Sequence, residues 1–284
     1  MENNELHIGV QIKSPKEIVE YYIHSGENKA SMPFLKLALL GIMAGALIAF
    51  GASSAAVSSH LVANAGLAKT IAGLVFPVGL IMILLFGAEL FTSGTMMVLG
   101  VVDKKYSVLK MLKAFAIIYF SNMVGAVMIV FMLHCAGQFD FTDAIGAYTI
   151  KVAIGKVHLD FMPALVSGIL CNLLVCGATL MAATAKDVIG KIFGALLPIF
   201  VFIIGGFEHC VANMFYIPAG ILASKNPEYV SQLEKLYGYG AEHVADLNLH
   251  HFFINNLVPV TIGNIIGGFM ISLTLYYCFV RKAK

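Results

Sequence analysis

The chain has 284 residues, of which 59% are hydrophobic and only 12% are charged, about half the charged share of soluble domains. This composition excludes a soluble globular domain, and a formal net charge of +2 scattered along the chain excludes a nucleic-acid-binding protein. We therefore predict an integral membrane protein surrounded by lipid. Its five cysteines form no C-x-x-C or other metal-binding spacing, so we expect neither a metal nor another cofactor.

A helix start precedes the first apolar stretch. The run S-P-K-E at 14–17 places Ser at the N-cap, Pro at the first helical position and Glu three residues after the cap. Apolar residues then fall on one face, and Gly26 suits a helix end. These features predict a short amphipathic helix, which lies either at the cytoplasmic membrane surface or docked on the transmembrane bundle.

The rest of the chain predicts six membrane crossings with short connections. Residues 1–30 would then be a cytoplasmic segment, and residues 31–284 a transmembrane pore domain. The second and fifth crossings are too long, since a straight helix of either would reach about 50 Å against a hydrocarbon core of roughly 30 Å. We expect both to be broken, with the break facing protein or water. The predicted crossings are Phe34–Val57, Leu67–Val102 (broken), Val108–Leu133, Met162–Thr184, Lys191–Ala223 (broken) and Phe252–Val280.

Lysine and arginine mark the orientation. Thirteen of these side chains fall on one side of the predicted crossings and four on the other, with Lys69 at the end of a span. This bias places both termini in the cytoplasm of a multi-pass plasma (inner) membrane protein.

The two halves of the chain repeat three short patterns in the same order. Gly41 and Gly168 begin a similar run in the first and fourth crossings, and G-x-E recurs in the second and fifth. The third and sixth crossings share N-x-x-G, at Asn122 and Asn264. Because each half has three crossings, the second half must insert with opposite orientation. The sequence therefore predicts an all-α protein of two inverted three-helix repeats, with helices 2 and 5 broken near the midplane.

Five runs of the chain carry a family resemblance. They are G-A-E-L-F-T-S at 87–93, K-V-H at 156–158, N-L-L-V-C at 172–176, G-F-E-H-C-V-A-N-M at 206–214 and P-V-T-I-G-N-I-I-G at 259–267. These runs resemble the formate/nitrite transporter family, and the resemblance extends from about residue 31 to residue 280. It implies a homopentamer of aquaporin-like protomers, each with its own pore for small monovalent anions such as formate, nitrite or hydrosulfide.

His209 is the principal candidate in the pore. An isolated histidine in an apolar segment is ordinarily a hydrogen-bonded core residue, but this one adjoins Glu208 at a predicted helix break. Its ordinary pKa allows it to give a proton to an entering anion. A neutral acid crosses an apolar constriction at far lower cost than its anion, so we expect protons to be partners of transport.

The two carboxylates in the broken crossings have a structural interpretation. Glu208 and Glu89 would hold backbone groups freed by the breaks or bond a neighbouring loop, since an anion pore lined by carboxylates would repel its substrate. Thr92, Asn172 and Asn264 supply neutral donors, which either join helices or line the pore.

The remaining site residues are assigned by the family resemblance. Phe76, Leu80 and Phe202 would form the cytoplasmic constriction, and Leu90, Phe91 and Val175 the outer one. Lys156 precedes the fourth crossing in an outer loop. A loop lysine is ordinarily only a solvated charge, but the resemblance makes it an attractor of anions at the outer vestibule.

Three functions follow from these features. An anion channel or proton-coupled anion transporter is favoured, and the T-S after Glu89 resembles formate members more than nitrite members. A neutral-solute pore of the aquaporin type comes second, but the chain has no Asn-Pro-Ala tripeptide. A membrane enzyme comes third, because the chain has no H-E-x-x-H, G-x-S-x-G or Walker motif.

Overall fold

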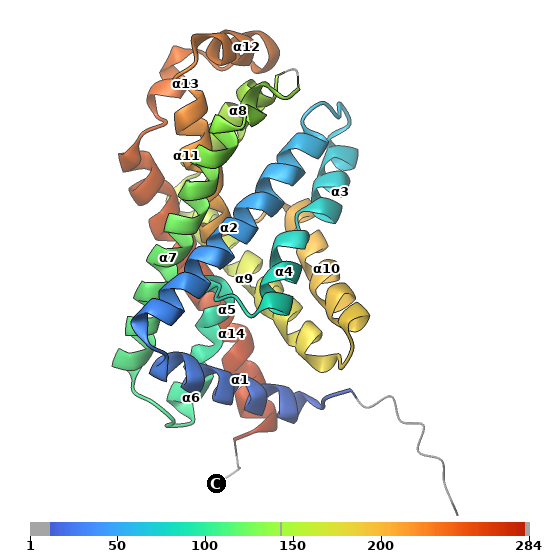
Figure 1. Ribbon diagram of the computed structural model, residues 1–284, viewed down its shortest axis with the longest axis vertical. Coiled ribbons are helices and arrows are strands. Elements are labelled where there is room, and N and C mark those ends of the chain that lie inside the picture. The colour runs from blue at the N-terminus through green and yellow to red at the C-terminus, as the bar shows by residue number, and fades with distance from the viewer. Residues whose placement is uncertain (1–11, 143, 282–284) are drawn as a thin grey trace, which may run out of the picture.

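The computed structural model describes residues 12–142 and 144–281, which form helices joined by turns (Figure 1). Six of the helical segments are long and apolar enough to cross a membrane, which confirms the predicted fold class. The crossings are α2 (Phe34–Ser59), α3 with α4 (Ala65–Val75, Val78–Phe86), α7 (Val108–Cys135), α9 (Phe161–Thr184), α10 (Val188–Gly205), and the π-helix His251–Leu257 continued by α14 (Val258–Phe279).

The second and fifth crossings are broken, as predicted. The first break follows α4 at Gly87, and the chain resumes as α5 (Phe91–Gly94), a 3-10 turn (Thr95–Met97) and α6 (Val98–Val102). The second break follows α10 at Gly206, and the chain resumes as α11 (Cys210–Ala223). Both glycines are left-handed, with φ of 73° and 67°, a conformation that costs other residues roughly 1–2 kcal/mol. Glycine therefore ends both helices for the same steric reason.

Two asparagines form equivalent hydrogen bonds to the backbone at the two breaks. The Asn122 amide nitrogen donates to the carbonyl oxygens of Gly41 and Glu89 at 2.8 and 2.9 Å, and its oxygen accepts from the Phe91 N–H at 2.9 Å.

In the second half, the Asn264 amide nitrogen donates to the carbonyl oxygens of Gly168 and Glu208 at 2.8 and 3.0 Å. Its oxygen accepts from the Cys210 N–H at 2.9 Å. These bonds satisfy backbone groups that lipid cannot satisfy. The matching partners confirm the inverted repeat that the sequence predicted.

Helix pairs equivalent in the two halves form the core. α2 packs along α7, and α9 packs along α14. Small residues allow this approach, because a Cβ at Gly125 would overlap the Ile42 carbonyl and one at Gly263 would overlap the Leu165 carbonyl.

The N-terminal helix α1 (Pro15–Ser31) begins at the predicted cap. Ser14 and Glu17 form a capping box, with the Glu17 N–H donating to the Ser14 hydroxyl. The helix docks on the bundle, and the Tyr22 hydroxyl donates to the Thr179 carbonyl of α9 at 2.9 Å. The predicted end at Gly26 was wrong, because the helix continues to Ser31. Gly26 serves instead as the contact point for the Tyr106 ring.

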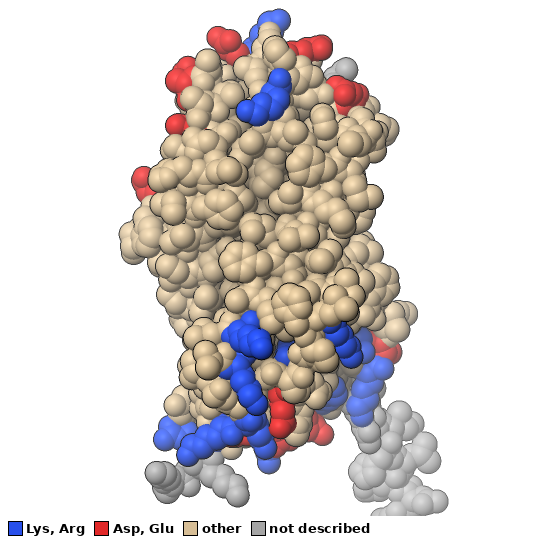
Figure 2. All heavy atoms as spheres, turned by 60° about the vertical axis from the view of Figure 1, so that its left-hand side comes forward, with Lys and Arg blue, Asp and Glu red and all other residues tan. Residues whose placement is uncertain are grey.

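The opposite end of the molecule carries a cap of helices, where the sequence predicted only short connections. Its members are α8 (Ile145–Val157), α12 (Pro227–Tyr237) and α13 (Ala241–Ala245), seen at the top of Figure 1. α12 packs on α8 through the buried Tyr229 and Leu233. Figure 2 shows Lys and Arg side chains gathered at the α1 end, with few at the cap.

Candidate functional site

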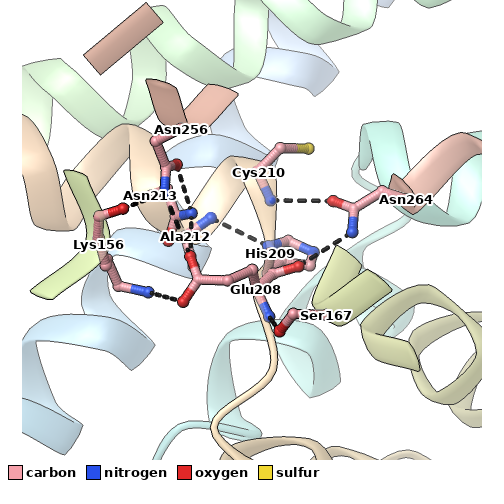
Figure 3. Close-up of polar contacts among 9 residues, drawn as sticks. All are labelled: Lys156, Ser167, Glu208, His209, Cys210, Ala212, Asn213, Asn256 and Asn264. Carbon is pink, nitrogen blue, oxygen red and sulfur yellow. Dashed lines mark hydrogen bonds and ion pairs between the residues drawn. The ribbon is translucent and has the colours of Figure 1, made fainter. Parts of the chain in front are cut away.

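His209 lies at the second helix break, where it is the N-cap residue of α11. The Ala212 N–H donates to its Nδ1 at 3.0 Å, so the ring satisfies one of the free backbone donors of the first helical turn (Figure 3). The side chain is buried. Its position is therefore fixed by the start of the helix.

The other ring nitrogen connects the two broken crossings. His209 Nε2 lies 2.9 Å from the Thr92 hydroxyl, which belongs to the short helix after the first break. A backbone N–H can only donate, so Nδ1 must be unprotonated and the proton of the neutral ring must be on Nε2. Nε2 then donates to Thr92, whose hydroxyl keeps its own hydrogen for another acceptor.

Glu208 is held in a buried polar network. Its carboxylate lies 2.9 Å from Lys156 Nζ and accepts from the Asn213 amide at 2.6 Å (Figure 3). The Asn256 amide donates to the Lys156 carbonyl at 2.9 Å and lies 3.5 Å from the same carboxylate. Asn256 comes from the π-helix, a local widening of a kind that is frequent at functional sites.

This network places Lys156 differently from the prediction. Lys156 lies in the last turn of α8 rather than in a loop, and its side chain is only 14% exposed in contact with Glu208. Its charge is neutralised, so the structure does not present it as a free attractor of anions. Glu208 binds a lysine and amides, while Asn264 satisfies the backbone at the break.

The first break carries an equivalent ion pair. Glu89 lies 2.7 Å from Lys29 Nζ, and their side chains are 10% and 15% exposed. Lys29 comes from the last turn of α1, so this pair also fastens the N-terminal helix to the membrane domain. Each half thus neutralises its buried carboxylate with a lysine from a helix outside the crossings.

The two remaining asparagines of the predicted site both serve as helix contacts in this structure. The Asn172 amide lies 3.1 Å from both the Thr92 carbonyl and the Thr95 hydroxyl, and 2.5 Å from the Asn264 carbonyl. Asn264 holds the second break as described above. Both side chains are fully buried. Of the two roles that the sequence left open for them, the geometry favours joining helices.

The six predicted constriction residues are all buried. Their predicted sides are reversed, because Phe76 ends α3 toward the cap, whereas Leu90 and Phe91 follow the first break toward α1 (Figure 1). The Phe76 and Phe202 rings pack edge to face with centroids 5.7 Å apart, and the Phe202 centroid lies 6.0 Å from that of His209. Phe91 packs against the rings of Phe115 and Tyr119 from α7. The full set, each at most 2% exposed, is Phe76, Leu80, Phe202, Leu90, Phe91 and Val175.

Sequence reasoning missed Lys29, Asn213 and Asn256. Asn213 and Asn256 are amides within apolar segments, and that polarity was the available signal. Lys29 gave no such signal, because it resembles the other basic residues of the α1 end.

Two inverted halves, six crossings and two helix breaks that meet at buried polar side chains define a membrane channel or transporter. A family model described as formate/nitrite transporter matches residues 16–278, and the chain belongs to this family. The family consists of transporters, which confirms the predicted class and the expectation that the protein is not an enzyme.

Individual relatives agree with this placement. Formate channel FocA of Haemophilus influenzae is 38% identical over 261 residues, which cover 90% of each chain. A probable formate transporter of Methanothermobacter thermautotrophicus is 36% identical and matches over 97% of this chain and 100% of its own. The solved structure of a pentameric formate channel with formate bound aligns with a TM-score of 0.77 at 32% identity, over 86% of this chain and 96% of that one.

Proposed function

We propose that the chain forms a channel for small monovalent anions and that formate is its principal permeant. The observation that carries this proposal is the contact between His209 and Thr92, which places two polar side chains among the buried apolar constriction residues. The relatives named as formate channels support formate over the alternatives, nitrite and hydrosulfide.

The proposed site works without an unpaired fixed charge. Lys156 and Lys29 are each bound to a glutamate, so neither supplies a free cation to the permeant. The Thr92 hydroxyl keeps a hydrogen that it donates to a carboxylate oxygen of formate, while His209 Nε2 donates to Thr92. An apolar constriction then opposes the bare anion and favours formic acid, because burying an unpaired charge is costly.

Proton donation requires a second form of His209. The neutral ring has its only proton on Nε2, and giving that proton away would leave an anionic ring. The ring must therefore first be protonated on Nδ1, which breaks the bond from the Ala212 N–H. The resulting imidazolium passes its Nε2 proton to Thr92 as Thr92 passes its own to formate, which leaves a neutral ring with its remaining proton on Nδ1. The resting form returns when Nδ1 loses that proton and Nε2 takes one from the aqueous end of the pore. Capping and proton donation are alternatives at one nitrogen.

We further propose a homopentamer in the plasma membrane with both termini in the cytoplasm. The gathering of Lys and Arg at the α1 end supports this orientation (Figure 2). The pentameric state of the similar channel structure supports the assembly. Native mass measurement of the detergent-solubilised protein tests it, and a monomer would remove the pentamer while leaving a pore in each chain.

The test of the mechanism compares two variants of His209 in proteoliposomes. His209→Asn keeps an acceptor for the Ala212 N–H but has no titratable nitrogen, whereas His209→Phe removes both. We expect pH-driven uptake of labelled formate to fall roughly tenfold or more in both variants, with His209→Asn closer to wild type in thermal stability. If the His209→Asn variant took up formate at the wild-type rate between about pH 5 and 8, proton donation by His209 would be ruled out.

A flux panel tests the substrate. Wild-type proteoliposomes are compared in formate, nitrite, hydrosulfide, chloride and glycerol. Formate should permeate faster than chloride and glycerol, and faster than the other two anions if it is the principal permeant. Glycerol flux equal to formate flux would instead indicate a neutral-solute pore.

A further inference from the structure

A cavity lies at the α1 end of the molecule, away from the His209 site. Its volume is about 480 Å³, and α1, the turn between α6 and α7, and the end of α14 enclose it. It is lined by Lys16, Glu20, Ile23, His24, Asp103, Lys105, Tyr276, Val280 and Arg281.

Three permanent cations from three different elements meet at this cavity. Lys105 Nζ lies 3.9 Å from Asp103 and Lys16 Nζ lies 3.8 Å from Glu20, which are long separations beside the 2.7 and 2.9 Å of the two buried pairs. The Arg281 guanidinium lies over the Tyr277 ring at 4.7 Å and forms no ion pair with the described part of the chain. These cations therefore keep donors for a ligand.

The cavity combines a basic rim with an apolar floor. Ile23 of α1 is 3% exposed, and Val280 packs against the apolar cluster that contains it. The Tyr276 hydroxyl donates to Asp103 at 3.0 Å, which holds that carboxylate against the wall. The three permanent cations and the two carboxylates that line the cavity leave one net positive charge. That charge matches a phosphodiester better than a dianionic phosphate.

The membrane side of the same helix end is apolar. Tyr277 of α14 is 51% exposed, and the Arg281 guanidinium of the cavity lies over its ring. Tyrosine is enriched at the level of lipid headgroups, and basic pockets between helices on the cytoplasmic side bind anionic headgroups. Acyl chains can lie along the Tyr277 ring while the headgroup occupies the cavity.

We propose that this cavity binds a phosphate group, and specifically the phosphodiester headgroup of an anionic phospholipid. The Arg281 guanidinium, Lys16 and Lys105 donate to the phosphate oxygens, and the acyl chains follow α14 into the bilayer. The bound headgroup bridges α1, the α6–α7 turn and α14, so it fastens the N-terminal helix at a second point besides the Lys29–Glu89 pair.

Native mass spectrometry of the full-length protein in detergent tests this site, with phosphatidylglycerol and phosphatidylcholine of identical acyl chains as probes. The cavity variant is Lys105→Gln/Arg281→Gln. The control is Lys110→Gln/Lys113→Gln, which removes two exposed charges from the same end of the molecule at the start of α7. We expect the apparent affinity for phosphatidylglycerol to fall roughly 25-fold in the cavity variant and little in the control. Equal losses in both variants, or equal retention of the two lipids by wild type, would overturn the proposal.

Two further measurements separate the outcomes. Lys16→Gln, at a lysine whose side chain is 63% exposed, keeps the test valid if the double variant does not fold, and we expect it to weaken phosphatidylglycerol retention several-fold. Thermal unfolding with added glycerol 1-phosphate separates the two sources of phosphate. A shift equal to that given by phosphatidylglycerol would keep the phosphate site but overturn its assignment to lipid.

Discussion

Lys156→Gln distinguishes a buried ion pair from a charge that steers anions. In the wild-type protein Lys156 Nζ lies 2.9 Å from the Glu208 carboxylate, and the two side chains are 14% and 7% exposed. The substitution leaves this buried carboxylate without its cation. Coulomb attraction at that distance is about 6 kcal/mol for an effective dielectric of 20. Breaking such a pair typically costs about 3–5 kcal/mol, because the remaining charge stays buried. We therefore expect a large loss of thermal stability.

The double variant Lys156→Gln/Glu208→Gln should recover part of that loss, because it removes both charges together. Lys235→Gln, at an exposed position of α12, is the matched control and should unfold like wild type. Thermal unfolding in detergent gives all four values.

Formate uptake at about 10 mM and about 500 mM salt, with osmolarity matched, then separates the two roles. Steering between exposed charges is screened over about 8 Å at physiological ionic strength, whereas a buried pair is not. The attractor role that the sequence favoured predicts a loss of uptake mainly at low substrate and low salt, but the ion pair predicts equal impairment at both salt concentrations. A stable Lys156→Gln protein that loses uptake only at low salt would refute the buried-pair reasoning.

Three other predictions concern the scaffold. Gly206→Ala and Gly87→Ala should each destabilise the protein by about 1–2 kcal/mol in thermal unfolding, since both positions are left-handed, and equal stability to wild type would contradict this strain. Asn122→Ala should reduce the yield of folded protein in membranes, because it leaves the Glu89 carbonyl and the Phe91 N–H at the first break without the amide, and a normal yield would show that water replaces it. Hydrogen bonds from Ser14 lower the pKa of Glu17, so the capping box stabilises α1 at neutral pH and loses this contribution as the pH falls through the lowered pKa. Ser14→Ala should accordingly speed amide exchange in the first turn of α1 at pH 7, and unchanged exchange would contradict the cap.

The sequence predicted the crossings and both breaks because their signals are local. Long apolar stretches reveal spans, and Gly87 and Gly206 stand beside glutamates that have few other reasons to lie in lipid. The inverted repeat was predicted from three sequence patterns in the same order. In the structure, Asn122 and Asn264 make equivalent hydrogen bonds in the two halves.

The charge pairing could not be predicted in the same way. Lys156 and Glu208 are 52 positions apart, and nothing in one sequence states that they meet. The cap helices were missed because α12 and α13 are largely polar and α8 is only 13 residues long, so none resembles a span. The π-helix depends on how backbone hydrogen bonds shift by one residue, which side-chain pattern does not encode.

One difference between the otherwise equivalent breaks has a consequence for transport. The residue after Glu89 is Leu90, and the residue after Glu208 is His209, so the same N-cap position carries an aliphatic group in one half and an imidazole in the other. The backbone of the pore is close to symmetric, but its barrier profile is not. The pore should therefore rectify, so that equal and opposite gradients of the permeant drive unequal fluxes. Exchanging Leu90 and His209 is the substitution expected to reverse the preferred direction.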